Sequence, residues 1–504
     1  MKRRLVIFVS YIKSTPREQM SFGFSSLDDM VDGDNAVRAI DAIVETLDKT
    51  KLDFVHATLA ATGRPPHNPI SLFKLYIYCY FEKIRSSRMI EKECTRNIEV
   101  MWLMEGIVPD HKCISEFRRQ NKDAIKTAFS EFIEICDALG LIGKKMAAID
   151  GSKFRANNAR KKNITIRKID KKLEHFRKML DEYNRELEEN DDKIITATEK
   201  INELNNIKET MQNQGRSEVS LTDPDSRLMI QANAGYEVSY NAQNAVDSKH
   251  DLVVATDVVN TPADQKQLYQ MADKAANIMG VTKQNPLTLL ADKGYFEGEN
   301  IQKCEEDKRF NAIVARPDEK GNDGYQKSRF RYDEANDQYV CPAGEILYRK
   351  GKTKQEYSNR RACMKCQYRE MCTKRENGRI VSRTEYEEAF EAATQRFSEN
   401  KELYKQRQMI VEHPFGTVKR TLGFTYFLTR GMENVQTENR LHMLTYNIKR
   451  VLNIFSIPDL LRLLKEMRAE KQGETLYFSL FFGYSSAICR KLAKQRRELA
   501  ILAS

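Results

Sequence analysis

The sequence has no long apolar run. Hydrophobic residues make up 41% of the 504 positions, but no stretch approaches the roughly 20 apolar residues that a helix needs to cross a bilayer. The most apolar stretch, residues 475–488, is short and is interrupted by Ser and Gly. Together with 31% charged residues, this excludes a helical membrane protein and predicts a soluble chain of several domains.

The sequence also lacks a secretory signal and a secreted-type cysteine framework. The N-terminal segment MKRRLVIFVSYIK has a basic start, but neither a full apolar core nor a small-residue cleavage site. We therefore expect a first strand or an extended arm there, and a cytoplasmic protein. Six of the ten cysteines are scattered, mostly in apolar helical contexts, and are expected to be small buried hydrophobes: Cys79, Cys94, Cys113, Cys136, Cys304 and Cys489.

Two short apolar runs each end in an aspartate with a glycine close behind. Asp150 follows residues 146–149, and Asp292 follows residues 287–291. Both runs are too short for helical periodicity and predict buried strands. A strand holds such a carboxylate still while its head meets solvent, which is typical of catalytic positions. Taken singly, each could instead be a strand-ending or helix-capping Asp.

A third carboxylate, Glu412, lies in the segment IVEHPFGTVKRT, about two helical turns before Lys419. Two strand-end aspartates and a helical glutamate suit two divalent cations. Mg²⁺ or Mn²⁺ prefers hard oxygen ligands, and Mg²⁺ takes only one or two carboxylates besides water and phosphate. Two such ions can activate the attacking oxygen and stabilise the leaving one in a phosphoryl displacement. The sequence thus predicts phosphodiester chemistry at Asp150, Asp292 and Glu412.

The blocks around these acids resemble a known family. AAIDGSK, LLADKGY and VEHPFGTVKR are similar to the three catalytic blocks of the DDE transposases of bacterial insertion sequences. GRPPHNPISLFKLYIYCYF and PDHKCISEFRR resemble their N-terminal helical domain, and DPDSRLM with GYEVSYNAQNAVD resembles the core hairpin region. The resemblance implies a ribonuclease H-like core in which Asp150, Asp292 and Glu412 are the catalytic residues and Mg²⁺ ligands.

A second part of the resemblance concerns the last helix. Related families carry a Tyr, Arg, Glu, Lys signature there, which Tyr404, Arg407, Glu412 and Lys419 match in order. Arg407 lies one residue further from the Glu than in the commonest spacing. The resemblance assigns Arg407 and Lys419 to holding phosphate near the scissile bond, and Tyr404 and Arg420 are expected on the DNA beside them.

Basic residues cluster directly after the first aspartate. The formal net charge is +11, from 83 Lys and Arg against 72 Asp and Glu, which favours a polyanionic partner. Residues 153–172 hold nine Lys or Arg and one acid, Asp170. A solvated surface run is the alternative, but phosphates need neutralising before they approach three acids. The predicted DNA-backbone contacts are Lys153, Arg155, Arg160, Lys161 and Lys162.

The remaining four cysteines predict a structural zinc site. Cys341 is followed by Cys363, Cys366 and Cys372. A C-x₂-C pair with two further cysteines at compatible distances can complete a tetrahedral four-thiolate site. The surrounding segment is basic, as a DNA-contacting ribbon would be.

Apolar spacing predicts an α/β fold with two interruptions. The resemblance implies a ribonuclease H-like mixed sheet after an all-α N-terminal domain, which serves DNA binding, helical packing or dimerisation. Helices are expected over residues 86–104 and 115–139 of that domain, and over residues 401–422, which include Glu412. From Ile166 a heptad seam predicts either one long helix or a hairpin that turns at residues 190–192 and contacts a second protomer or DNA. The hairpin is favoured because both chain ends must return to one sheet. The expected units are the N-terminal domain (1–140), the core (141–163, 216–317 and 384–455), the helical insert (164–215), the cysteine-rich insert (318–383) and a basic helical tail (456–504).

The function predicted from these features is DNA transposition. A metal-activated water would free a 3′-hydroxyl at the element's end, and that hydroxyl would attack a target strand. The partners would be double-stranded DNA, as terminal inverted repeats and target, and further copies of the chain, as a homodimer or larger assembly. The protein would be associated with the nucleoid when bound to DNA. The alternatives are a nuclease of the same fold without strand transfer and a non-catalytic zinc-bearing DNA-binding protein.

Overall fold

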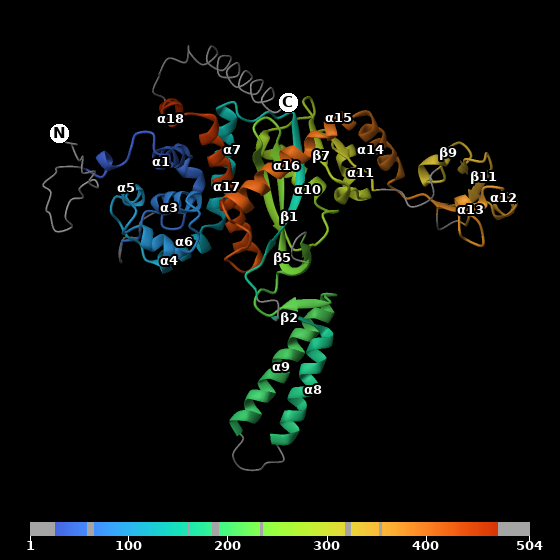
Figure 1. Ribbon diagram of the computed structural model, residues 1–504, viewed down its shortest axis with the longest axis horizontal. Helices are drawn as coiled ribbons and strands as arrows, with labels where there is room; N and C mark the ends of the chain where they lie inside the picture. Colours follow the sequence, from blue (N-terminus) through green and yellow to red (C-terminus); the bar gives the residue numbers. More distant parts are fainter. Residues whose placement is uncertain are drawn as a thin grey trace, which may run out of the picture.

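The computed structural model describes residues 26–57, 65–158, 162–183, 191–231, 235–317, 324–351 and 355–471. A helical N-terminal region lies beside a central mixed sheet, and two inserts extend from that sheet in different directions (Figure 1). The predicted mixed α/β architecture with a helical N-terminal region is therefore confirmed. The predicted N-terminal arm, Arg160, Lys161 and the basic stretch after residue 471 lie outside the described residues.

The N-terminal region consists of short helices around the apolar helix α3. The predicted helix over residues 86–104 is two helices, because the Asn97 side chain accepts the N–H groups of Glu99 and Val100 and starts a new one. Asn121 likewise separates the two halves of the helix expected over residues 115–139. The helices are α1 (Ala36–Thr46), α2 (Lys49–Leu52), α3 (Pro69–Phe81), α4 (Ser87–Glu93), α5 (Ile98–Leu103), α6 (His111–Gln120) and α7 (Lys122–Ala138).

The central sheet is built around β1. On one side β1 pairs in parallel with β7, which pairs in parallel with β8. On the other side β1 pairs antiparallel with β5, whose far edge carries β6 and β4. The strands are β1 (Met146–Arg155), β4 (Arg227–Gln231), β5 (Gly235–Asp247), β6 (Leu252–Val259), β7 (Leu287–Ala291) and β8 (Phe310–Val314).

Helices cover both faces of this sheet. Gln243 and Asn244 are neighbours in β5 and so face opposite sides. Gln243 contacts the loop before α10 (Leu268–Met279), whereas Asn244 contacts Met443 of α17 (Met432–Ile454). Helix α11 (Gly298–Glu306) packs beside α10, and α16 (Gln406–Gly416) packs on β1 and β5. Helix α17 also packs on α3 and α7, so it joins the N-terminal region to the sheet.

The helical insert is a hairpin with a core of its own. Helices α8 (Ile166–Tyr183) and α9 (Asp191–Asn213) pack on each other, and α8 also packs on a small sheet of β2 (Asn163–Thr165) and β3 (Glu218–Ser220). The hairpin points away from the central sheet (Figure 1). Residues 184–190, between the two helices, lie outside the described residues. The prediction that the turn includes residues 191 and 192 is wrong, because both belong to α9. The core of the hairpin consists of Ile164, Ile169, Leu173, Leu204 and Met211.

The second insert is a small antiparallel sheet with two short helices. Its strands pair in sequence order, and Phe330, Tyr339, Leu347, Tyr357 and Val381 form its core. The elements are β9 (Arg331–Asp333), β10 (Gln338–Val340), β11 (Ile346–Arg349), β12 (Glu356–Ser358), α12 (Arg360–Lys365), α13 (Arg369–Cys372) and β13 (Ile380–Ser382).

The chain then returns to the central sheet through a broken helix. The sequence predicts one helix over residues 401–422, but the structure has α15 (Lys401–Tyr404), α16 and a π-helical turn, Thr417–Thr421. Pro414 lies inside α16 and has no N–H to donate to the preceding turn. Helix α14 (Glu387–Glu399) precedes this segment and α18 (Ile457–Lys471) ends the described chain. None of the described helices has the length and apolar character that a bilayer crossing requires.

Candidate active site

Asp150 and Asp292 lie side by side at the point where β7 ends. In the parallel pairing of β1 with β7, Ile149 lies opposite Ala291, so the next residue on each strand is an aspartate. Strand β7 stops there, whereas β1 continues to Arg155. The sequence predicted both strands and the exit at Asp292, but the exit predicted at Asp150 is wrong because Asp150 lies in the middle of β1. The parallel register is what brings the two carboxylates to one place.

The turn after β7 holds Asp292 in position. The Gly294 N–H donates to Asp292 Oδ1 at 2.7 Å, so the carboxylate caps the short helix Lys293–Tyr295. Its neighbour in that helix, Tyr295, is fully buried. One oxygen of Asp292 is therefore used to fix the turn.

Asp150 is largely buried, and its electrostatic surroundings are unfavourable to its charge. Burial raises the pKa of Asp150 to about 6, and the nearby Asp292 and Asp264 act in the same direction. The guanidinium of Arg407 acts against them. A carboxylate held in this way is stabilised by any cation that reaches it.

Arg407 supplies positive charge beside Asp150. Its Nη1 lies 3.8 Å from Asp150 Oδ1, and both side chains are mostly buried. Within the described part of the chain, this Nη1 has no hydrogen-bond partner. Tyr404, from the same predicted signature, lies with its ring 5.9 Å from the Arg407 guanidinium carbon. Both residues thus line the aspartate site.

Glu412 is placed differently from the two aspartates. Its side chain is exposed on α16, and its Oε1 accepts a hydrogen bond from Gln408 Nε2 at 2.8 Å. Across the residues that the structure describes, no three His, Cys, Asp or Glu side chains are grouped so as to hold a metal ion. The structure therefore brings Asp150 and Asp292 together and leaves Glu412 on the surface of the helix that carries Arg407.

Lys419 anchors the π-helical turn to β1. Its Nζ donates to Ser152 Oγ at 2.7 Å and to the Lys153 carbonyl at 2.8 Å, and it lies 4.4 Å from the centre of the Phe154 ring. Burial and the neighbouring Lys153 lower the pKa of Lys419 to about 8. Ser152 and Asp150 point to the same face of β1, so this ammonium lies on the face of the candidate site.

The other predicted DNA contacts fall into different environments. Lys153 is paired with Asp264 at 3.2 Å, and its side chain is only 18% exposed. Arg155 is exposed and lies 5.8 Å from the ring of Tyr426. Lys162 and Arg420 are exposed as well. Exposed basic residues thus remain at the far end of β1, just before β2 and within the π-helical turn.

Three residues near the aspartates were not predicted from the sequence. Asp264, in the loop before α10, accepts hydrogen bonds from two side chains of β5, one of which is Gln243. Gln243 in turn accepts a hydrogen bond from the Tyr295 hydroxyl. Asp264 lies in a polar loop, whereas Gln243 and Tyr295 lie within predicted elements. No spacing or composition signal in the sequence therefore marks any of the three as a site residue.

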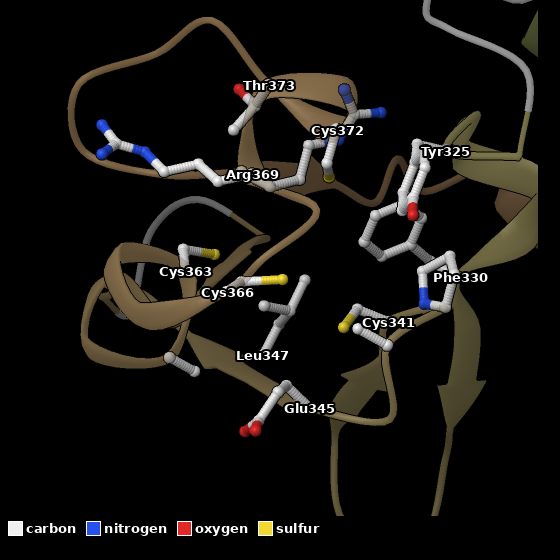
Figure 2. A pocket seen from close by; sticks show the side chains of 14 residues that line it. Tyr325, Phe330, Cys341, Glu345, Leu347, Cys363, Cys366, Arg369, Cys372 and Thr373 are labelled. Carbon is white, nitrogen blue, oxygen red and sulfur yellow. The ribbon is translucent and has the colours of Figure 1, made fainter.

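The four cysteines of the second insert line one cavity. Cys341 follows β10, Cys363 lies in α12, Cys366 follows that helix and Cys372 ends α13. Figure 2 shows their sulfur atoms directed toward a common space, and that cavity has a volume of about 30 Å³. No disulfide joins these cysteines.

Without a bound cation, the surroundings of this cavity favour a neutral thiol at Cys372. Burial raises the pKa of Cys372, Arg379 opposes this, and the three other cysteines add to the rise. Gly378 has a φ of +85° and packs so closely that an added Cβ would lie 2.6 Å from Cys363 Cβ. The predicted zinc would bind in this cavity, but in the described part of the chain the four side chains are not grouped so as to hold a metal ion, and the zinc site stays a prediction.

Comparisons with known proteins match two separate parts of the chain. A family model described as a Transposase domain (DUF772) matches residues 25–120, and one described as a Transposase DDE domain matches residues 340–452. The comparison with curated proteins finds no match. A solved structure of a piggyBac transposase synaptic complex with hairpin DNA is similar at 10% identity, with a TM-score of 0.32 over 90% of this chain and 85% of that chain.

The two family models cover separate parts of the chain. One matches the helices of the N-terminal region, and the other matches the cysteine-bearing insert together with α16 and α17. Between them lie the strands that carry Asp150 and Asp292. Both models describe transposase domains, so the comparisons support a DDE-type transposase.

Proposed function

We propose that this transposase cuts DNA at the ends of a bacterial insertion sequence and joins those ends to target DNA, with Asp150, Asp292 and Glu412 as its catalytic acids. The observation that carries the proposal is the parallel register that places Asp150 beside Asp292. The strand order β6-β5-β1-β7-β8 supports a ribonuclease H-like core, because the first three strands are antiparallel and the last two run parallel to β1.

The acids would hold Mg²⁺ or Mn²⁺. The residues fit such ions, since Asp150 is a partly buried carboxylate beside a second one, and the Arg407 guanidinium and the Gly151 N–H compensate its charge only in part. When bound, the metal would neutralise phosphate charge and lower the pKa of an attacking oxygen. Glu412 would complete the ligand set from α16, which requires its release from Gln408.

The chain's own cations would position the DNA. Arg407 lies against Asp150 and would bind a phosphate oxygen next to the scissile bond, because its fork of N–H groups matches phosphate geometry. Lys419 would fix β1 on the same face. Arg155 and Lys162, exposed beyond the acids, would hold the duplex backbone without reading its sequence.

The insert would be a zinc-ribbon-like module. Cys341, Cys363, Cys366 and Cys372 line one cavity, and four thiolates satisfy tetrahedral Zn²⁺. Such an ion would hold α12 and α13 on the small sheet, whose core is too small to be stable unaided. Its role would be structural.

Incubation with DNA carrying the element's ends tests the proposal. Wild-type protein with Mg²⁺ should give 3′-hydroxyl ends and, with a target plasmid, joined products. Asp292→Ala should give neither, while it binds the end DNA with unchanged affinity. Cleavage without joining would favour a nuclease, and no cleavage by the wild type would refute the proposal.

A further inference from the structure

The loop between β6 and α10 brings a further carboxylate against β1, from the face opposite Asp150. Asp150 lies opposite Asn244 in the pairing of β1 with β5, and Gly151 lies opposite Gln243. Adjacent residues of a strand point to opposite faces. Asp264 reaches the Gly151 side, and an added Cβ at Gly151 would lie 2.7 Å from Asp264 Oδ1. The missing side chain of Gly151 is therefore what lets Asp264 approach the backbone next to Asp150.

Asp264 ties β1 to β5 at this point. Its Oδ1 accepts hydrogen bonds from Asn241 Nδ2 at 2.6 Å and Gln243 Nε2 at 2.7 Å, and Lys153 Nζ lies 3.2 Å away. Asn241 and Gln243 are fully buried. Lys153 comes from β1 and the two amides come from β5, so one carboxylate joins both strands over Gly151. With three donors on one oxygen, Asp264 is already satisfied by the protein and is not a free ligand.

The same network reaches the second aspartate. The buried Tyr295 hydroxyl donates to Gln243 Oε1. Tyr295 belongs to the short helix that Asp292 caps. Asp264 thus orients Gln243, Gln243 holds Tyr295, and Tyr295 holds the turn of Asp292. On the other branch, Asp264 packs on Gly151, the residue after Asp150.

We propose that Asp264 is a positioning residue that sets the relative placement of Asp150 and Asp292 through Gly151, Gln243 and Tyr295. It acts from the face of the sheet that carries α10, while the reacting DNA meets the other face. The proposal rests on the assignment of Asp150 and Asp292 as catalytic acids. Outer groups that orient metal ligands change metal affinity or activity by about 10- to 100-fold when they are removed.

Two variants test the network at different links. Asp264→Asn removes the charge that holds Lys153, and Tyr295→Phe removes only the hydroxyl that binds Gln243. Each should lower kcat for end cleavage by about 10- to 100-fold, while the KM for DNA stays within about twofold because both residues act from the face of the sheet opposite the DNA. Asp273→Asn is the matched control, because Asp273 lies on α10 and pairs with Arg309, which precedes β8 and is not part of this network.

A second readout does not use activity. The Mn²⁺ concentration that gives half of the maximal rise in Tm should increase by about 10-fold or more in Asp264→Asn and Tyr295→Phe, but not in Asp273→Asn. Unchanged kcat and Mn²⁺ dependence in Tyr295→Phe would overturn the proposal. If the wild type does not cleave, the proposed function fails, and the Mn²⁺ titration alone decides whether Asp264 positions the two aspartates.

Discussion

Replacing Asp150 by Asn should stabilise the protein in the absence of divalent metal. Burial raises the pKa of Asp150 from 3.8 to about 6, so above pH 6 the native state carries an anion that the unfolded chain solvates better. Asn keeps the shape and removes the charge. The expected gain at pH 8 is about 3 kcal/mol, at about 1.4 kcal/mol per pH unit between the two pKa values.

The extra free energy of unfolding of Asp150→Asn over the wild type should increase as the pH rises. Between about pH 4 and pH 6 the native state binds more protons than the unfolded state, so wild-type stability falls as pH rises through this range. The advantage of Asp150→Asn should therefore be about 3 kcal/mol at pH 8, about half of that at pH 5 and near zero at pH 4. Added Mg²⁺ should stabilise the wild type at pH 8 and leave the variant unchanged.

Denaturant titrations at pH 5 and pH 8, on protein prepared without divalent cations, measure this difference. Asp273→Asn is the control, since it loses an ion pair with Arg309 and should gain nothing. Equal stability of Asp150→Asn and wild type at pH 8 would refute the reasoning. So would a gain of the same size at both pH values, because it would not come from the charge.

The remaining predictions concern the helical acid, the thiolates and the basic end of β1. Glu412→Gln should abolish end cleavage with unchanged DNA affinity, and full cleavage would remove Glu412 from the site. Purified protein should contain about one zinc ion per chain by elemental analysis, as four thiolates require; Cys366→Ser should lose it, and metal-free wild type with all four thiols reactive would contradict the assignment. Arg155→Ala combined with Lys162→Ala should weaken the binding of specific and of non-specific DNA about equally. The slope of the logarithm of the binding constant against the logarithm of the salt concentration should fall by roughly one for each phosphate that is no longer neutralised. An unchanged slope would assign both residues to solubility.

Local sequence signals predicted the elements of the site well. The apolar runs before Asp150 and Asp292 are strands, because a buried strand is recognisable from a few apolar residues between breakers. The exit was correct only for Asp292, since β1 continues past Asp150 to Arg155. Helix boundaries set by capping side chains were not predicted. Asn97 splits a predicted helix in two, because a side chain that accepts backbone N–H groups starts a helix even inside an apolar pattern.

Residue types and spacing alone predicted which side chains would carry the chemistry: the two aspartates that follow apolar runs, the helical glutamate, the basic run and the four cysteines. Tertiary structure decided how they meet. The parallel register of β1 with β7 places Asp150 beside Asp292, and the loop before α10 brings Asp264 to Gly151. These contacts join residues far apart in the chain. They follow from strand pairing and packing across the sheet, which no local pattern around Asp264 or Tyr295 records.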